Sequence, residues 1–430
     1  MKRNSKRPMP SKLAVLTDNF STLKVKNIRI YMTGQLVNLL GDWMQQTAQA
    51  WIVWELTHKA TALGIVAFLS QIPFFIFGPW AGVFADRFDK KNILLITQVL
   101  TMAFAFIMAL LIQKNVLLLW HIYVLAFLLG TATAFNVTAE QTFIGELAGP
   151  GNIKKAIALN NSLNQLTRLA GPAIAGWVMA STTAAVLFWA NGVSVIVSII
   201  CIAIIPSRRP DKAEPEGGLK QFQEGLNFLK RQKLLRLIIL FAAIQTFFGM
   251  SLVQLLPAFS SIVLKGSADT LGNLIGAAGA GSLVGILVIL PFIQRVKRSC
   301  VVIGGGVIWA GAWYILISFT HNQPLAILCQ FMASLGAANV LTLSVGLAQE
   351  LTPKNMRARI VSTFMMTILG LQPFASFLVG KSADLIGISK MMRINGVFMI
   401  VLSTLLLAVP RIYKLKTSIS IPAVRNQVIS

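Results

Sequence analysis

Charged residues are scarce in this chain, and acidic residues are the scarcest of them. Only 12% of the 430 residues are charged, with 14 Asp and Glu against 38 Lys and Arg, whereas 55% are hydrophobic and the mean hydropathy is +0.71. Soluble domains carry about 25% charged residues, so this composition argues against a water-soluble enzyme. It indicates instead a chain that crosses a membrane many times.

Residues that build catalytic and metal sites are also few. The three cysteines, Cys201, Cys300 and Cys329, lie in apolar stretches without ligand-like spacing, and the three histidines are far apart in the sequence. Neither a zinc site nor a disulfide framework is indicated. The sequence also lacks a nucleophile with a recognisable base and the phosphate-binding pattern G-x-x-x-x-G-K-[ST]. We therefore expect no enzyme, no ATP-driven pump and no cofactor.

Long apolar runs, by contrast, occur along the whole chain. A window of about 19 residues predicts twelve transmembrane helices, six on each side of a polar linker. The expected fold class is an all-α polytopic membrane protein with two six-helix lobes. The predicted helices span residues 28–55, 61–84, 92–113, 118–139, 157–181, 185–206, 234–260, 270–293, 300–319, 324–349, 359–380 and 391–410.

The polar segments around these runs divide the chain into five expected parts. The segment before Ile28 is basic and has no apolar signal-peptide core, so we expect a cytoplasmic tail. In the linker, Leu219, Phe222, Leu226 and Leu229 recur at helical spacing, which predicts a short amphipathic helix that lies on the inner membrane surface or packs on the bundle. The parts are a tail (1–27), an N-terminal lobe (28–206), a linker (207–233), a C-terminal lobe (234–410) and a second tail (411–430).

The basic residues are distributed unevenly across the predicted membrane. With the N-terminus inside, 31 of the 38 fall in the tails and inner loops and six on the outer side, while Arg168 alone lies within a helix. This asymmetry follows the positive-inside rule and places both termini in the cytoplasm. It explains the net charge of +24 without nucleic acid, because the basic loops offer few of the aromatic residues on which bases stack.

The two halves of the chain resemble each other. The matching segments, offset by about 203 residues, are Glu146-Leu147 and Glu350-Leu351, Asn152-Ile153-Lys154 and Asn355-Met356-Arg357, and Gly171-Pro172 and Gln372-Pro373. Parallel repeats of six helices are typical of two-lobed transporters, in which the substrate binds between the lobes.

Polar residues recur at helical spacing within several predicted helices. In the first helix Gln35, Asn38, Asp42, Gln45 and Gln49 are spaced by 3, 4, 3 and 4 residues, so they share one face. Such residues either line a cavity or bond neighbouring helices. We favour a cavity, because similar rows occur in particular helices of both halves. Its expected lining consists of Gln35, Asn38, Gln45, Gln49, Asn136, Asn161, Asn164, Gln245, Asn339 and Thr342.

The loop after the second predicted helix carries the most specific motif. Residues of the pattern G-x-x-x-D-R-x-G-R-K are matched at Gly82, Asp86, Arg87, Lys90 and Lys91, whereas the second glycine of the pattern is Asp89 here. The loop thereby resembles the signature of the major facilitator superfamily. With the twelve helices, the inside termini and the repeat, the resemblance covers nearly the whole chain.

Three further segments point to a branch of this superfamily. They are Gly41-Asp42-Trp43-Met44 with Trp51-Ile52-Val53, Asn164 to Arg168 with Gly171-Pro172-Ala173, and Met356-Arg357-Ala358-Arg359. They resemble the branch of enterobactin exporters and macrolide efflux proteins. The resemblance implies a monomer in the lipid bilayer of the bacterial cytoplasmic (inner) membrane, which exports an amphiphilic small-molecule substrate, such as a siderophore or drug, in exchange for protons.

Two other functions remain as alternatives. One is a lysophospholipid transporter or flippase of the same fold. The other is a channel or membrane sensor, which is disfavoured because a pore is normally repeated by symmetry and the two halves of this chain are unlike.

In the family fold, the loop motif closes the inner side of the transporter. The resemblance places Asp86 at the start of the eleventh helix, where free N–H groups favour an anion, and Lys90 beside Glu140. The expected inner gate consists of Gly82, Asp86, Arg87, Lys90, Lys91, Glu140, Arg357 and Arg359.

Asp42 and Arg168 are expected to lie at similar depths in the N-terminal lobe. By helical rise they lie about 21 Å and about 18 Å from the inner ends of their helices, near the middle of the bilayer. A permanent ion pair between them is one interpretation. In the other, Asp42 exchanges a proton as the cavity alternates, and cargo that competes for Arg168 links transport to protons.

Overall fold

Helices form almost all of the described part of the chain. The computed structural model describes residues 21–149, 151–206, 227–229, 232–293, 298–353 and 356–408, and within these ranges it contains no strand that pairs into a sheet. The expected all-α fold class is confirmed.

The N-terminal lobe contains six long helices, preceded by a short 3-10 turn, η1 (Ser21–Lys24). They are α2 (Lys26–Thr57), α3 (Ala60–Arg87), α4 (Lys90–Gln113), α5 (Leu119–Ala148), α6 (Ile153–Ser181) and α7 (Ala184–Ile204). Most are apolar enough to cross a bilayer by composition alone, but α2 and α6, which carry the polar rows, are not among these.

The C-terminal lobe also contains six helical segments, of which the first two are irregular. The first comprises α9 (Lys233–Ile244), η2 (Gln245–Gly249), η3 (Met250–Leu255), α10 (Leu256–Ala258) and η4 (Phe259–Val263), and the second α11 (Ala268–Val284), η5 (Gly285–Ile289) and α12 (Leu290–Ile293). In these segments η2, η4 and η5 are π-helical turns. The others are α13 (Ser299–Ile317), α14 (Gln323–Glu350), α15 (Arg357–Ile386) and α16 (Ile388–Leu407).

The twelve predicted helices therefore agree with the structure, and the main difference is at the end of α5. This helix continues nine residues beyond its predicted end, to Ala148. The extension is not membrane-like in sequence, but it has an apolar side that packs inside the lobe. Phe143 and Ile144 are buried there, and the Phe143 ring meets the Tyr31 ring of α2 at 5.5 Å.

The linker helix predicted from Leu219, Phe222 and Leu226 lies outside the described residues. The fourth residue of that pattern, Leu229, is described and is buried in the same hydrophobic core as Leu235.

The two lobes meet along two helix pairs, α3 with α15 and α6 with α11. Small residues allow close approach: a Cβ at Gly64 would lie 2.6 Å from the Ser376 carbonyl oxygen, and one at Gly272 would lie 2.6 Å from that of Pro172. Further along the first pair, the Phe68 ring meets the Phe374 ring at 5.5 Å. These contacts lie near the first residues of α3 and α11, which the positive-inside rule predicts to be at the outer surface.

A carboxylate joins the lobes at this outer end. Asp384 of α15 accepts hydrogen bonds from the backbone N–H groups of Ala60 (2.7 Å) and Thr61 (2.8 Å) and from the Thr61 hydroxyl. Ala60 and Thr61 begin α3, whose first N–H groups have no partner within the helix. Asp384 therefore caps a helix of the opposite lobe.

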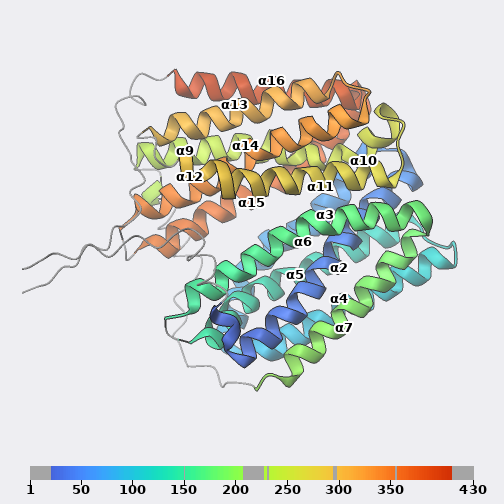
Figure 1. The fold of residues 1–430 in the computed structure, drawn as a ribbon, viewed down its shortest axis with the longest axis vertical. Coiled ribbons are helices and arrows are strands. Elements are labelled where there is room, and N and C mark those ends of the chain that lie inside the picture. Colours follow the sequence, from blue (N-terminus) through green and yellow to red (C-terminus); the bar gives the residue numbers. More distant parts are fainter. Residues whose placement is uncertain are drawn as a thin grey trace, which may run out of the picture.

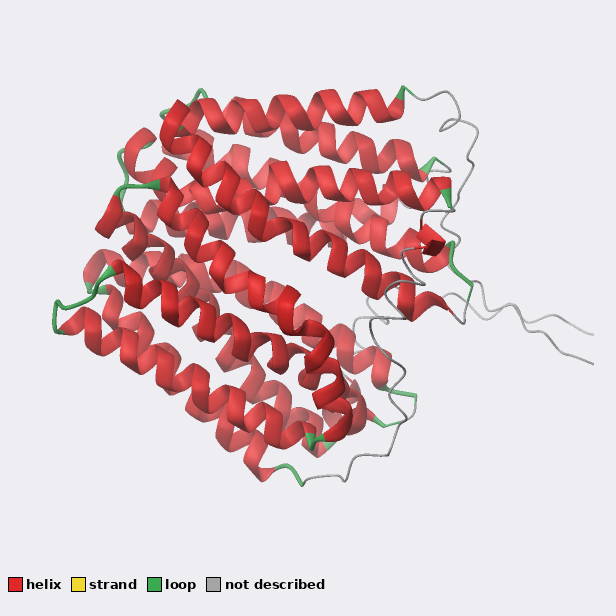
Figure 2. Ribbon diagram, turned by 180° about the vertical axis from the view of Figure 1, so that it is seen from behind, coloured by secondary structure: helices red, strands yellow, loops and turns green. Residues whose placement is uncertain are grey.

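At the other end, the lobes diverge. Figures 1 and 2 show the two groups of helices approaching each other at one end and separating toward the end at which α7 ends and α9 begins. On α3, Trp80 and Phe84 are 59% and 45% exposed, and no atom lies within 4 Å of the position of a Cβ at Gly82. The structure is thus closed at the end predicted to be outer and open at the end predicted to be cytoplasmic.

Replacing Asp384 with Ala is expected to favour opening at the outer end, because the N–H groups of α3 lose their acceptor from the opposite lobe. Hydrogen bonds to a charged group contribute about 1.5–3 kcal/mol, so the equilibrium should shift by roughly tenfold or more. Spin labels at Lys59→Cys and Leu385→Cys, in a protein whose three native cysteines are replaced, would report a larger population of long outer distances.

Asp269→Ala is the matched control for this measurement. Asp269 is a carboxylate at the same end of the molecule, but it accepts its hydrogen bond from Ser267 in its own lobe. An unchanged distance distribution in Asp384→Ala would show that the cap does not hold the lobes together.

Candidate functional site

The polar row of α2 forms a chain of hydrogen bonds inside the N-terminal lobe. At its inner end, the Gln35 amide and the Asn160 amide of α6 both donate to Oε1 of Glu140 on α5, each at 2.9 Å. Two turns further along α2, Asp42 accepts from Asn38 and from Asn191 of α7, each at 3.3 Å. Asn191 also donates to Oε1 of Gln45 at 2.7 Å.

These bonds correct the expected lining of the substrate cavity. Gln35 and Gln45 are buried and bond other helices of their own lobe, and the buried Asn38 bonds Asp42 within α2. Asn136 of α5 likewise donates to the Thr97 hydroxyl of α4 at 2.9 Å. The polar side chains on this face of α2 need hydrogen-bond partners, and residues of the same lobe supply several of them.

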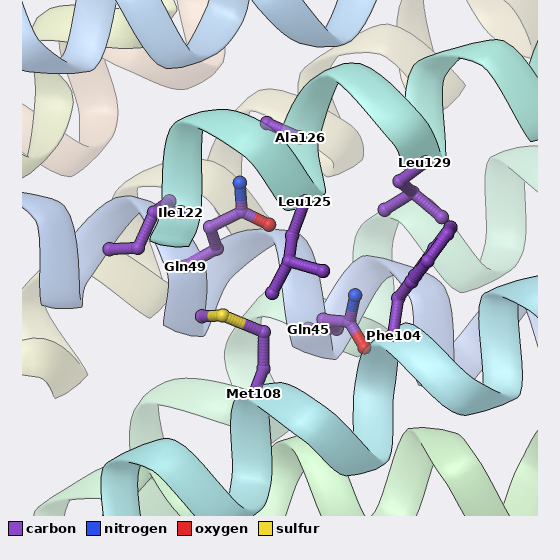
Figure 3. A pocket seen from close by; sticks show the side chains of 8 residues that line it. All are labelled: Gln45, Gln49, Phe104, Met108, Ile122, Leu125, Ala126 and Leu129. Carbon is purple, nitrogen blue, oxygen red and sulfur yellow. The ribbon is translucent and has the colours of Figure 1, made fainter. Parts of the chain in front are cut away.

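Gln49 continues this row beside a small cavity between α2, α4 and α5. Figure 3 shows Gln45 and Gln49 beside Met108 and other apolar side chains. The space of about 10 Å³ holds about one water molecule. It is too small for a cargo molecule.

Asn160 and Asn191 are functional candidates that the sequence analysis missed. Asn191 is a single amide in an apolar stretch, and Asn160 lies one residue before the row of Asn161 and Asn164, on a different side of α6. Asn191 is fully buried in α7 and bonds two residues of α2. A lone Asn in the middle of an apolar predicted helix is the signal that could have identified it, since such a side chain needs a partner within the protein.

Arg168 of α6 does not bind Asp42. Its guanidinium lies over the Trp43 ring, 5.4 Å from the ring centre, and no carboxylate of the described residues forms an ion pair with it. The expected permanent ion pair is therefore wrong for this conformation. Asp42 and Trp43 are neighbours in α2 and so point about 100° apart around the helix, the first toward α7 and the second toward α6.

Arg168 lies close to the contact between the lobes. A Cβ at Gly279 of α11 would lie 3.2 Å from the Arg168 carbonyl oxygen and 2.8 Å from Cα of Leu169. The guanidinium also interacts electrostatically with Tyr314 of α13, in the opposite lobe. Arg168 is therefore a cation at the interface, held by an aromatic ring and without a counter-ion among the described residues.

The remaining expected lining residues are divided between the interface and the interior. Asn161 and Thr342 are exposed, and Asn164 is half-buried on the same face of α6 as Asn161. Thr342 and Asn339 bond backbone carbonyl groups of their own helix, α14. Gln245 is buried in the π-helical turn η2, and neither polar atom of its side chain has a hydrogen-bond partner among the described residues.

The loop motif between α3 and α4 fixes the inner end of the N-terminal lobe. Asp89 is the N-cap of α4 and accepts from the Lys91 backbone N–H at 2.9 Å, which explains why this residue can replace the glycine of the motif. Lys91 Nζ donates to the carbonyl groups of Ala203 (2.8 Å) and Ile205 (2.6 Å) at the end of α7.

Lys90 binds Glu146, not Glu140 as expected. Its ammonium lies 3.3 Å from Oε1 of Glu146, on the extension of α5. Glu146 lies on the part of α5 beyond its predicted end, and there it comes within reach of Lys90. Glu140 already accepts hydrogen bonds from two amides. Arg87 is exposed, whereas the side chains of Asp86, Arg357 and Arg359 lie outside the described residues, so the gate contact expected of them remains a prediction.

Comparison with known proteins agrees with this architecture. The chain is 23% identical over 392 residues to the staphyloferrin A transporter of Staphylococcus aureus, which covers 90% of this chain and 97% of that protein. It is also 23% identical over 410 residues to macrolide efflux protein A of Streptococcus pyogenes, covering 93% and 99% of the two chains.

Solved structures share the fold. A bacterial homolog of the human lysosomal transporter Spinster, in an inward-facing and occupied conformation, matches with a TM-score of 0.71 at 12% identity, covering 95% of this chain and 98% of that one. A POT family transporter in complex with 5-aminolevulinic acid matches with a TM-score of 0.71 at 13% identity, covering 90% and 96%.

A family profile decides the assignment. The family described as transmembrane secretion effector matches residues 17–427, which is nearly the whole sequence. The chain therefore belongs to this family of major facilitator superfamily transporters.

Proposed function

We propose that this membrane transporter is a secondary active exporter of an amphiphilic, siderophore-like or drug-like small molecule. It works by alternating access in the cytoplasmic membrane and exchanges its cargo for protons. The names of its relatives, a staphyloferrin A transporter and a macrolide efflux protein, support this class of cargo.

Alternating access is supported by the unequal contacts at the two ends of the lobes. The outer ends are joined by Asp384 and by close glycine contacts, whereas near the inner end no atom lies within 4 Å of the position of a Cβ at Gly82. A transporter in this state receives cargo from the cytoplasm. Export then requires the inner ends to approach and the bonds of Asp384 to break.

The observation that carries proton coupling is the environment of Asp42. This carboxylate lies within the bilayer region of the lobe, and the two groups that bond it are neutral amides. A charge held there without a counter-ion is costly, and proton uptake removes that cost. Asp42 is thus suited to exchange a proton during the cycle.

Asp42 and the interface are linked through α2, not through displacement of an ion pair. Trp43, the next residue, supports the Arg168 guanidinium at the boundary between the lobes. A proton at Asp42 changes its bonds to Asn191, and α2 transmits that change to Trp43. The Arg168 guanidinium has up to five donors for the oxygen atoms of a cargo, and Trp43 offers it apolar surface.

Replacing Asp42 with Asn mimics the protonated carboxyl and should uncouple transport from protons. In proteoliposomes, we expect exchange of labelled for unlabelled cargo to continue, whereas accumulation driven by a pH gradient falls to background. The cargo panel consists of staphyloferrin A, a macrolide and a lysophospholipid, so the same assay decides between small-molecule export and the lipid alternative.

Asp269→Asn is the control, because this carboxylate bonds Ser267 at the outer end of α11. It should retain both activities. If Asp42→Asn still accumulates cargo with a pH gradient as the sole driving force, Asp42 does not couple transport to protons.

Replacing Arg168 with Gln should weaken cargo binding without unfolding the protein. Loss of a charge-assisted hydrogen bond costs about 1.5 kcal/mol or more, which corresponds to roughly tenfold weaker binding. Titration calorimetry of the protein in nanodiscs, with whichever panel member is transported, measures this change.

The matched control is Arg393→Gln, another arginine over an aromatic ring, 3.7 Å from the centre of Phe319. It lies in α16, away from the contact of α6 with α11. Equal affinities of wild type and Arg168→Gln would place the cargo elsewhere.

A further inference from the structure

Glu140 is a second carboxylate inside the N-terminal lobe, and its two oxygen atoms differ. Gln35 and Asn160 both donate to Oε1, whereas no described residue donates to Oε2. Both donors are neutral amides, from α2 and α6, and no cation of the described residues forms an ion pair with Glu140. One oxygen is fixed by hydrogen bonds, and the other is available to carry a proton.

Glu146, six residues further along α5, provides a contrast within the same helix. Lys90 is only 5% exposed and lies 3.3 Å from Oε1 of Glu146. Lys90 therefore pairs with Glu146, and no ion pair joins a cation to Glu140 among the described residues. A carboxylate without a counter-ion in a low-dielectric interior is costly, and proton uptake by Glu140 removes that cost.

Glu140 and Asp42 are connected by one face of α2. Gln35 bonds Glu140, and Asn38, one turn further on, bonds Asp42. Seven residues separate Gln35 from Asp42, or about 10 Å along the helix. The two carboxyl groups interact electrostatically, and Tyr31 of α2 is the other titratable group that interacts with Glu140.

We propose that Glu140 is a second proton-exchanging residue of the transporter, which takes up protons at Oε2 and titrates together with Asp42. This inference rests on the proposed proton coupling and extends it to two interacting carboxyl groups. A proton from water on the inner side binds the Glu140 carboxylate to form the carboxylic acid, and leaves by the same route. Because each charge disfavours the other, the two groups release their protons as a coupled pair.

The test is an infrared pH titration of the reconstituted protein without cargo and without a gradient. The carbonyl signal of protonated carboxyl groups should be reduced in Glu140→Gln, and the titration of the remaining signal should shift relative to wild type. Glu140→Gln keeps an oxygen that accepts the bonds of Gln35 and Asn160, so the packing is preserved. Glu140→Asp should restore a titrating carboxyl signal.

Glu146→Gln is the matched control, since it removes a glutamate from the same helix that is paired with Lys90. Its titration curve should keep the Glu140 component that Glu140→Gln loses. Identical titrations of wild type and Glu140→Gln, or an equal loss of signal in Glu146→Gln, would overturn the proposal. A melting temperature and a monodisperse elution like those of wild type show that each variant is folded.

Because the titration needs neither cargo nor transport, it fails independently of the proposed function. If Glu140→Gln loses carbonyl signal but a pH gradient does not drive cargo transport by wild type, Glu140 is a proton site and the proposed proton exchange is wrong. If a pH gradient drives transport but Glu140→Gln titrates like wild type, proton exchange stands and Asp42 alone carries the protons.

Discussion

The free-energy cost of a polar group without a partner in hydrocarbon determines how the N-terminal lobe is built. Lipid cannot solvate the polar row of α2, so each of these side chains needs a partner within the protein. Amides on α6 and α7 and a carboxylate on α5 supply the partners. The polar helix is consequently placed among its neighbours, while α4 and α7 expose apolar side chains such as Ile96 and Val193.

The same constraint gives the two lobes different chemistry. The charged side chains that lie inside the described N-terminal lobe are Asp42 and Arg168, near the middle of α2 and α6, and Glu140, in the last third of α5. In the C-terminal lobe, the amide of Gln245 is buried without a hydrogen-bond partner among the described residues, and the first segment contains two π-helical turns. Such turns often mark functional positions in membrane and soluble helices alike. The buried charged side chains thus lie in one lobe and the π-helical turns in the other.

The sequence was sufficient for the helices but not for the partners of their side chains. Apolar length predicted all twelve helical segments, because it depends on local composition. Helical spacing showed that Asp42 and Gln35 share a face, but it contains no information about which helix lies opposite. Asp42 was therefore paired with Arg168, although the helix turn directs it to Asn191. Lys90 was paired with Glu140 for a related reason, since the end of α5 was predicted too early.

Contacts between glycine-rich helix faces differ in kind from contacts between interlocking side chains. Where α6 meets α11, a Cβ at Gly176 would lie 2.9 Å from the Ala268 carbonyl oxygen, and the backbone of Gly272 lies equally near. Surfaces of this kind present few protruding groups that must be withdrawn before the helices turn relative to each other. At such a contact, one helix can rotate against the other while the two remain packed together. Resistance to rotation is then concentrated in a few directional bonds, and a small number of residues can set the rate of the whole cycle.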